Sequence, residues 1–186
     1  SSADDEIIKA FDSFSVSRSL TLRKKSGNSY SYRISGEHRY TQTRNELSQQ
    51  IIDLGLNGTY SQNKFIPDLY KYNSVEVRLA LLQGLLDTDG FISKNGFRIE
   101  SCTVSPRLAA DIKFIVESLG GIVKTKLYND SLEYHSVHNG HIIQGKFPPY
   151  IIGIKFNPGI VPFRLSRKIA RFKPKVRHFY RYITAI

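Results

Sequence analysis

The stretch LLQGLLDTDG at residues 81–90 constrains the fold of this chain more than any other. It ends an apolar segment of helical spacing that begins after Asn73 or Ser74, and it places two carboxylates, Asp87 and Asp89, before a glycine. Because the C-terminus of a helix carries partial negative charge, each acid there costs about 0.3–1 kcal/mol. A helix that keeps two acids at this end is expected to serve a site.

Two small residues in the same helix support this interpretation. Ala80 and Gly84 stand four residues apart and therefore share one face. A glycine in mid-helix costs about 1 kcal/mol relative to alanine, and small residues at this spacing let a second helix approach closely. We therefore predict that Ala80 and Gly84 form a helix-packing face.

Three interpretations of the two acids compete. An EF-hand loop fails because the positions of its first and twelfth ligands hold Leu85 and Gly96. A structural turn explains Asp89 followed by Gly90, but it does not explain the small residues in the helix. In the third interpretation, two such helices pack together and a divalent cation lies between their acids, as in metal-assisted phosphodiester hydrolysis.

Composition favours a nucleic-acid partner. The 186 residues carry a net charge of +11 with a pI of about 9.8, and 40% of them are apolar. No apolar run is long enough to span a membrane and no signal peptide is seen, so a cytoplasmic or nucleoid-associated location is expected. The single cysteine, Cys102, forms no internal disulfide and is expected to be buried and inert. The histidines lack the spacing of a zinc site.

Hydrophobic periodicity and turn residues predict an α+β chain. Helices are expected over 4–14, 44–54, 74–88, 105–121 and 163–172, a hairpin with a KNG turn over 91–104, and strands near 17–24, 30–35, 122–128, 132–138, 141–145 and 150–156. Two weak similarities, Ser1 with Ser105 and Lys64 with Lys168, share an offset of 104 residues, which predicts a duplicated fold. The partner of the acidic motif is then expected about fifteen residues before Ser1.

Residues 82–90, LQGLLDTDG, are a close variant of LAGLIDADG, and the chain resembles the LAGLIDADG homing endonucleases. NKFIP at 63–67, Arg78 and the S-x-x-L-A-x-D pattern at 105–111 resemble the intein-encoded (DOD-type) branch, and the resemblance covers essentially the whole chain. It implies a duplicated αββαββα fold with saddle-shaped antiparallel sheets on DNA. Residues 1–73 would be a first half without its motif helix, and residues 74–186 the second half.

The resemblance also implies roles for single residues. Asp89 would be catalytic and bind the metal, Mg²⁺ or Mn²⁺, whereas Asp87 would be a helix-end residue. Lys64 and Lys168 would be the catalytic lysines of the two halves, where a cation stabilises the transition state. Basic residues on exposed strands and near Lys168 would bind DNA: Arg18, Arg23, Lys25, Arg33, Lys94, Arg98, Lys124, Lys126, Arg164, Arg167 and Arg171, with Tyr30, Tyr32, Tyr128, His135 and His138 as further candidates.

The function expected from this resemblance is site-specific, metal-dependent cleavage of double-stranded DNA by an intein-associated homing endonuclease domain. Two alternatives stay open: a non-cleaving DNA-binding module on the same scaffold, and an intron maturase that binds RNA. The partner is expected to be double-stranded DNA, with no membrane partner. The chain would be a pseudo-dimeric monomer once the missing motif helix is restored, and would otherwise self-associate through the 74–88 helix.

Overall fold

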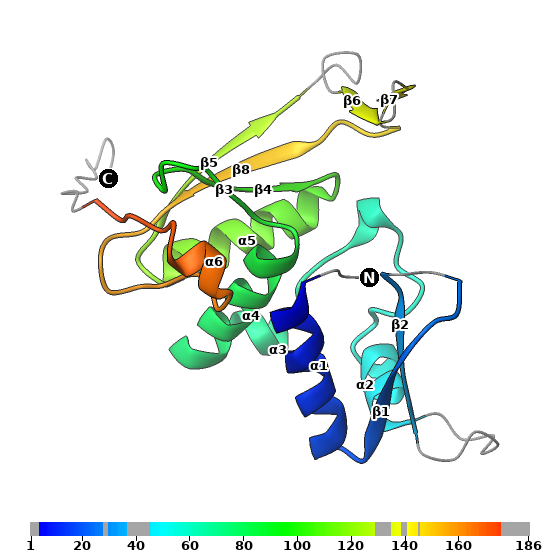
Figure 1. The fold of residues 1–186 in the computed structure, drawn as a ribbon. Coiled ribbons are helices and arrows are strands. Elements are labelled where there is room, and N and C mark those ends of the chain that lie inside the picture. Colours follow the sequence, from blue (N-terminus) through cyan, green and yellow to red (C-terminus); the bar gives the residue numbers. More distant parts are fainter. Residues whose placement is uncertain are drawn as a thin grey trace. The chain divides into compact units, whose positions relative to one another are not determined.

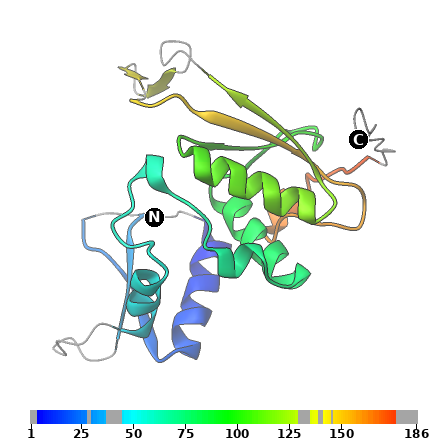
Figure 2. The same cartoon turned by 180° about the vertical axis from the view of Figure 1, so that it is seen from behind.

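The computed structural model describes residues 4–27, 30–36, 45–128, 135–138, 141–144 and 146–175. The chain divides into two compact units, Ser1–Asn57 and Gly58–Ile186. Both contain helices and antiparallel strands (Figures 1 and 2). The α+β class and the antiparallel sheets expected from the sequence are therefore confirmed.

The first unit holds two helices and one pair of strands. They are α1 (Asp5–Ser17), β1 (Leu20–Lys24), β2 (Tyr32–Gly36) and α2 (Glu46–Asp53). Both helices begin at a side-chain cap: Asp4 accepts a bond from the Glu6 amide at 3.2 Å, and Asn45 accepts one from the Ser48 amide at 2.9 Å. α2 ends before Gly55, whose positive φ of 69° suits glycine.

The second unit begins with the short helices η1 (Ser61–Asn63) and α3 (Asp68–Lys71), followed by the motif helix α4 (Val75–Thr88). Then come β3 (Phe91–Ile92), β4 (Ile99–Thr103), α5 (Pro106–Ser118), β5 (Ile122–Leu127), β6 (His135–His138), β7 (His141–Gln144), β8 (Tyr150–Lys155) and α6 (Ser166–Ile169). Four strands form an antiparallel sheet in the order β3-β4-β8-β5, while β6 and β7 pair separately. α5 lies on one face of the four-stranded sheet, and α4 packs against α5 (Figures 1 and 2).

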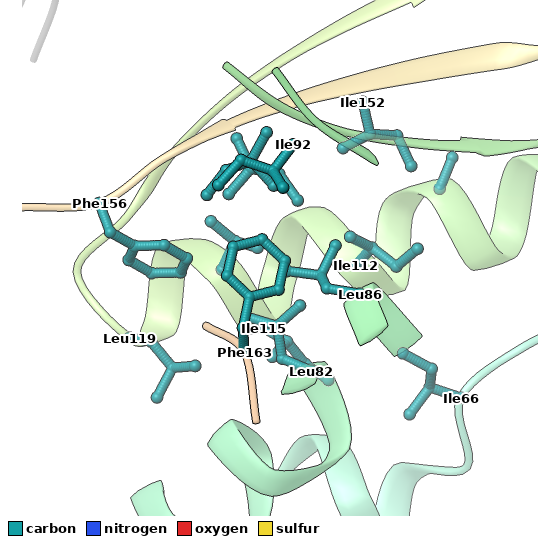
Figure 3. Close-up of a cluster of buried hydrophobic side chains, with 14 residues drawn as sticks. Ile66, Leu82, Leu86, Ile92, Ile112, Ile115, Leu119, Ile152, Phe156 and Phe163 are labelled. Atoms are coloured by element: carbon teal, nitrogen blue, oxygen red, sulfur yellow. The ribbon is translucent and has the colours of Figure 1, made fainter. Parts of the chain in front are cut away.

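The core of the second unit lies between this sheet and the two helices. Leu82 and Leu86 of α4, Ile115 of α5 and Ile152 of β8 are fully or almost fully buried. Phe163, from the segment after β8, inserts its ring into the same cluster (Figure 3). The end of the motif helix is therefore built into the core by residues from the far end of the chain.

Strand alternation gives the sheet an inner and an outer face. Ile99 pairs with Ile154, and Ser101 pairs with Ile152; these four residues are buried. The neighbouring outer positions include Cys102, which is exposed. The expectation of a buried Cys102 is wrong, because Ile99 fixes the phase of β4 and turns every second side chain outward.

The helix expected over 163–172 is also wrong, because only Ser166–Ile169 is helical. Leu165 has extended backbone angles, and the amides of Arg164 and Leu165 donate to the carboxylate of Asp87. The segment before α6 is thus held in an extended shape by a bond to α4. The motif helix itself begins at the cap Ser74, whose hydroxyl accepts from the Val77 amide at 3.4 Å.

The boundary between the two compact units falls between Asn57 and Gly58, so residues 58–73 belong to the second unit. The predicted division into two repeat halves at 73/74 concerns internal duplication and not compactness, and it stays a prediction. The two lysines that suggested the repeat have unlike surroundings: Lys64 is extended and exposed, whereas Lys168 is helical and buried.

Candidate functional site

Asp89 stands at the C-terminal cap of α4 and is exposed. Its backbone amide donates to the Leu85 carbonyl at 3.0 Å, which continues the helical pattern into the motif. Among the described residues its carboxylate has no hydrogen bond and no ion pair. Both carboxylate oxygens are therefore available to a ligand from solvent.

Asp87, two residues earlier, is in the opposite situation. It is only 7% exposed, and one oxygen accepts from the amides of Arg164 at 2.8 Å and Leu165 at 3.3 Å. Its other oxygen, Oδ1, is buried without a hydrogen-bond partner in the described part of the chain. Asp87 thus ties the helix end to the segment before α6, in agreement with the structural role expected for it.

Lys168 contacts the same helix end from α6. It is 4% exposed, and its ammonium donates to the carbonyls of Leu86, Asp87 (2.9 Å) and Gly90 (2.7 Å). These carbonyls lie in or next to the last turn of α4, where the final backbone acceptors of a helix lack helical partners; the Leu86 carbonyl also accepts from the Gly90 amide at 3.1 Å. The last turn of α4 contains no basic residue of its own. The cation that the helix end needs comes from α6.

A side-chain pair closes the contact on the solvent side. The amide nitrogen of Gln83 donates to the Val161 carbonyl at 2.8 Å, and its oxygen accepts from Nε of Arg164 at 2.9 Å. Together with the bonds of Asp87 and Lys168, this pair fastens the last two turns of α4 to residues 161–168. We call this group of contacts the helix-end clamp.

The face of α4 around Gly84, turned away from the buried Leu82 and Leu86, is open among the described residues. A Cβ atom built on Gly84 would find no heavy atom within 4 Å among the described residues, and Gly84 is exposed. Ala80 on the same face is only partly buried. This agrees with a helix-packing face, which stays a prediction until a partner helix is seen.

Lys64 lies in an extended segment that α5 holds in place. The Lys64 carbonyl accepts from the Ser105 hydroxyl at 2.6 Å, and the Ile66 amide donates to Asp111 at 2.8 Å. The Lys64 ammonium is exposed and has no hydrogen bond or ion pair within the described residues. The S-x-x-L-A-x-D pattern therefore supplies both anchors of this segment, Ser105 and Asp111.

Sequence reasoning missed the ion pair below this segment. Lys71 donates to Asp111 and to Asp68, at 2.8 Å in each case, and the side chains of Lys71 and Asp111 are 11% and 8% exposed. The bond to Asp111, and then the bond to Asp68, raise the pKa of Lys71. The bond to Lys71 lowers the pKa of the Asp68 carboxyl. The i, i+3 spacing of Asp68 and Lys71 was a usable signal, but the link to Asp111 was not.

The predicted DNA-binding residues of the first unit lie on or beside its strands. Arg23 and Arg33 are direct cross-strand neighbours, and both are exposed. Like charges directly opposite each other destabilise a strand pair, so this pair suggests an anionic ligand. Lys25 is exposed just after β1, and Arg18 forms a solvent-exposed ion pair with Glu46 at 3.5 Å.

In the second unit, Lys124 and Lys126 of β5 are exposed, and Lys126 lies 4.2 Å from the Tyr128 ring centroid. Arg98 contacts Glu100 at 3.4 Å and stacks over Phe91. The remaining predicted cations are exposed in the β3–β4 turn and around α6: Lys94, Arg164, Arg167 and Arg171. Of the further candidates, His135 and His138 are the end residues of β6, Tyr30 precedes β2, and Tyr32 is the first residue of β2.

Within the described part of the chain, no complete set of protein metal ligands is brought together. The described residues contain no cluster of three or more His, Cys, Asp or Glu side chains. They also contain no helix long and apolar enough to cross a membrane. Any metal at Asp89 would therefore need ligands from a second helix, from substrate or from water.

The motif helix and the sheet correspond to a known kind of domain. Residues 76–147 match the LAGLIDADG-like domain family, so the chain contains a LAGLIDADG-like domain, as the motif had suggested. A stretch of 68 residues is 43% identical to the ATP-dependent DNA helicase Hel308 of Thermococcus kodakarensis. That match covers 34% of this chain and 6% of the helicase, so the chain corresponds to a small part of that relative's length.

Proposed function

We propose that this chain binds double-stranded DNA and cleaves it by metal-dependent phosphodiester hydrolysis, as a homing endonuclease domain. The observation that carries the proposal is the contrast between the two motif acids. Asp87 is buried and accepts hydrogen bonds from two backbone amides, whereas Asp89 is exposed and has no partner among the described residues. A helix that secures one acid and leaves the next one free suits a ligand-binding end.

Asp89 fits a divalent cation that is shared with substrate. Mg²⁺ is often held by one or two carboxylates together with substrate phosphates, so a single free carboxylate is a suitable contribution. When bound, Mg²⁺ or Mn²⁺ would supply Lewis-acid stabilisation of the phosphodiester and a more acidic water. The second acid would come from another helix packed on the face of Ala80 and Gly84.

Lys64 is the second catalytic candidate in this proposal. Its ammonium is exposed, and its backbone is fixed from α5 by Ser105, so the charge stands on a rigid support. Such a cation stabilises negative charge that develops on a phosphate. Lys168 completes the predicted catalytic set, but its described bonds lead to the motif helix.

DNA would meet the exposed cations of both units. In the second unit the exposed cations lie on the strands and around α6. Strands can enter a DNA groove as a β-ribbon, and the cations around α6 can contact phosphates beside it. In the first unit, Arg23 and Arg33 would share a phosphate. The order α1-β1-β2-α2 resembles α5-β5-β8-α6 with the separate pair β6 and β7 inserted between β5 and β8, which supports the proposed duplication and a saddle-shaped DNA surface.

The small share of the helicase that matches suggests how such a domain occurs. A LAGLIDADG-like segment that covers 6% of an ATP-dependent DNA helicase is compatible with an element inserted into that protein. We infer an intein-type insertion of the same kind for this chain.

Two measurements test the proposal. Affinity for double-stranded DNA should fall steeply with salt, because a basic surface releases counterions on binding. A cleavage assay on a DNA site library, with the chain in its full-length context, should show Mg²⁺-dependent cutting that Asp89→Asn abolishes. Asp12→Asn, which removes an exposed acid of α1, is the matched control and should cut normally.

A non-cleaving DNA-binding module is the second candidate, and one observation favours it. The described residues offer only one free motif carboxylate, and the sequence carries one motif. This candidate predicts the same salt-dependent binding, no cutting under any metal, and no effect of Asp89→Asn. Competition by structured RNA at lower concentrations than duplex DNA would instead favour the maturase alternative.

A further inference from the structure

We propose that Lys168 is a positioning residue: it fixes the end of the motif helix and so orients Asp89, without touching DNA or water itself. This inference deepens the proposed function and rests on it for the role of Asp89. It assigns to Lys168 a task different from that of Lys64, although the repeat pairs the two lysines.

The first argument is the number of donors. An ammonium group has three N–H donors and no acceptor. The Lys168 ammonium donates to three backbone carbonyls, those of Leu86, Asp87 and Gly90. All three donors are therefore used within the fold, and none is left for a phosphate oxygen or an attacking water.

The second argument is burial. Lys168 is 4% exposed and its ammonium lies 5.7 Å from the ring centroid of Phe163, a fully buried residue. An ammonium in such surroundings is costly unless it is completely hydrogen-bonded. Moving it toward solvent would remove this donor from the carbonyls of Asp87 and Gly90 and one of the donors from that of Leu86, so the fold favours the observed position.

The third argument is electrostatic. The C-terminal end of α4 combines the negative end of the helix dipole with two acids, and its last turn has no basic residue. Lys168 supplies a positive charge at this end from a position about eighty residues later in the chain. With that charge in place, the helix can end in acids and still be stable.

The fourth argument is geometric. Lys168 donates to the carbonyls of Leu86 and Gly90, which lie before and after Asp89 in the chain. Asp87 accepts from the backbone amides of residues 164 and 165. The backbone of Asp89 is thus fixed from both sides, although its side chain has no partner among the described residues. Ligand residues need this kind of support, since the loss of an orienting partner typically weakens metal binding about 10–100-fold.

The test compares Lys168→Met and Lys168→Arg with the control Lys113→Met, which removes an exposed lysine of α5. Methionine keeps much of the apolar stem and removes the donors, whereas arginine keeps the charge but replaces a compact ammonium with a planar fork. Three quantities are measured for the full chain: amide hydrogen exchange over residues 85–92, Mn²⁺ affinity, and affinity for a random DNA duplex at low salt.

Both Lys168 variants should raise exchange over residues 85–92 at least about tenfold, whereas α5 should change by less than about twofold. Mn²⁺ affinity should fall at least about tenfold, and duplex affinity should stay within about twofold. Lys113→Met should leave exchange over residues 85–92 and Mn²⁺ affinity at wild-type values. If Lys168→Met does not fold, Lys168→Gln, which keeps two donors, takes its place under the same criteria.

Wild-type exchange over residues 85–92 in Lys168→Met would overturn the proposal. A fall in duplex affinity far beyond twofold in Lys168→Met would also overturn it, because Lys168 would then act on DNA directly. If the wild-type chain binds no Mn²⁺, the metal assignment of Asp89 fails, but the exchange measurement still decides the role of Lys168. The two failures are therefore distinguishable.

Discussion

Replacing Gly84 with alanine should stabilise the second unit by about 1 kcal/mol, because a mid-helix glycine costs about that much relative to alanine. The structure removes the usual objection to such a change, since a Cβ at Gly84 meets no described heavy atom within 4 Å. A gain of this size corresponds to a Tm increase of roughly 4 °C for a unit of this length. Circular dichroism on heating, and urea denaturation, would measure it.

Gly90 provides the matched control within the same motif. A Cβ there would lie 2.5 Å from the Leu86 carbonyl oxygen and 2.7 Å from the Leu86 Cα, so the backbone must shift. Gly90→Ala should therefore destabilise the unit by about 1–3 kcal/mol, with the opposite sign to Gly84→Ala. A destabilising Gly84→Ala would refute the reasoning that this helix face is open. If the face packs against a second helix, Gly84→Ala should also weaken that association.

Three further outcomes follow from described contacts. Lys71→Met should lower the free energy of unfolding by about 2 kcal/mol by stranding the Asp111 carboxylate. The pKa of Lys71 is raised above its ordinary 10.5, so its contribution to stability is complete below that pH and is lost as the pH rises through its pKa in the folded state. In alkaline titrations of stability, Lys71→Met should lack this loss. Gly96→Ala places a Cβ 1.8 Å from the Arg171 carbonyl oxygen at a φ of 79° and should increase proteolysis after residue 170. Arg23→Ala and Arg33→Ala should each reduce the salt slope of DNA binding by about 1.

Local signals predicted most of the secondary structure. The cap Ser105 and the glycine after α2 predicted helix boundaries to within a few residues, because caps depend only on neighbouring backbone groups. The inward face of α5 followed from its spacing of apolar residues. Cys102 was assigned from residue type, although the alternation set by Ile99 already placed it outward.

The helix-end clamp could not be predicted in the same way. Its bonds join Gln83, Asp87 and Gly90 to residues about eighty positions later, and no local pattern specifies such a pairing. Lys168 stands among several basic residues and looks like a surface cation in the sequence. Only the fold shows that it is buried and that its donors are spent on α4.

The second unit can complete its fold only late in synthesis, because the residues after β7 supply both β8 and the helix-end clamp. β8 pairs with both β4 and β5, and the clamp arrives later still, with residues 161–168. Until the ribosome has released these residues, β4 and β5 lack their shared neighbour and the motif helix has a bare carbonyl end. A nascent chain that stops near residue 147 would therefore present unpaired strand edges to its surroundings, and chaperone contact should be concentrated in that interval.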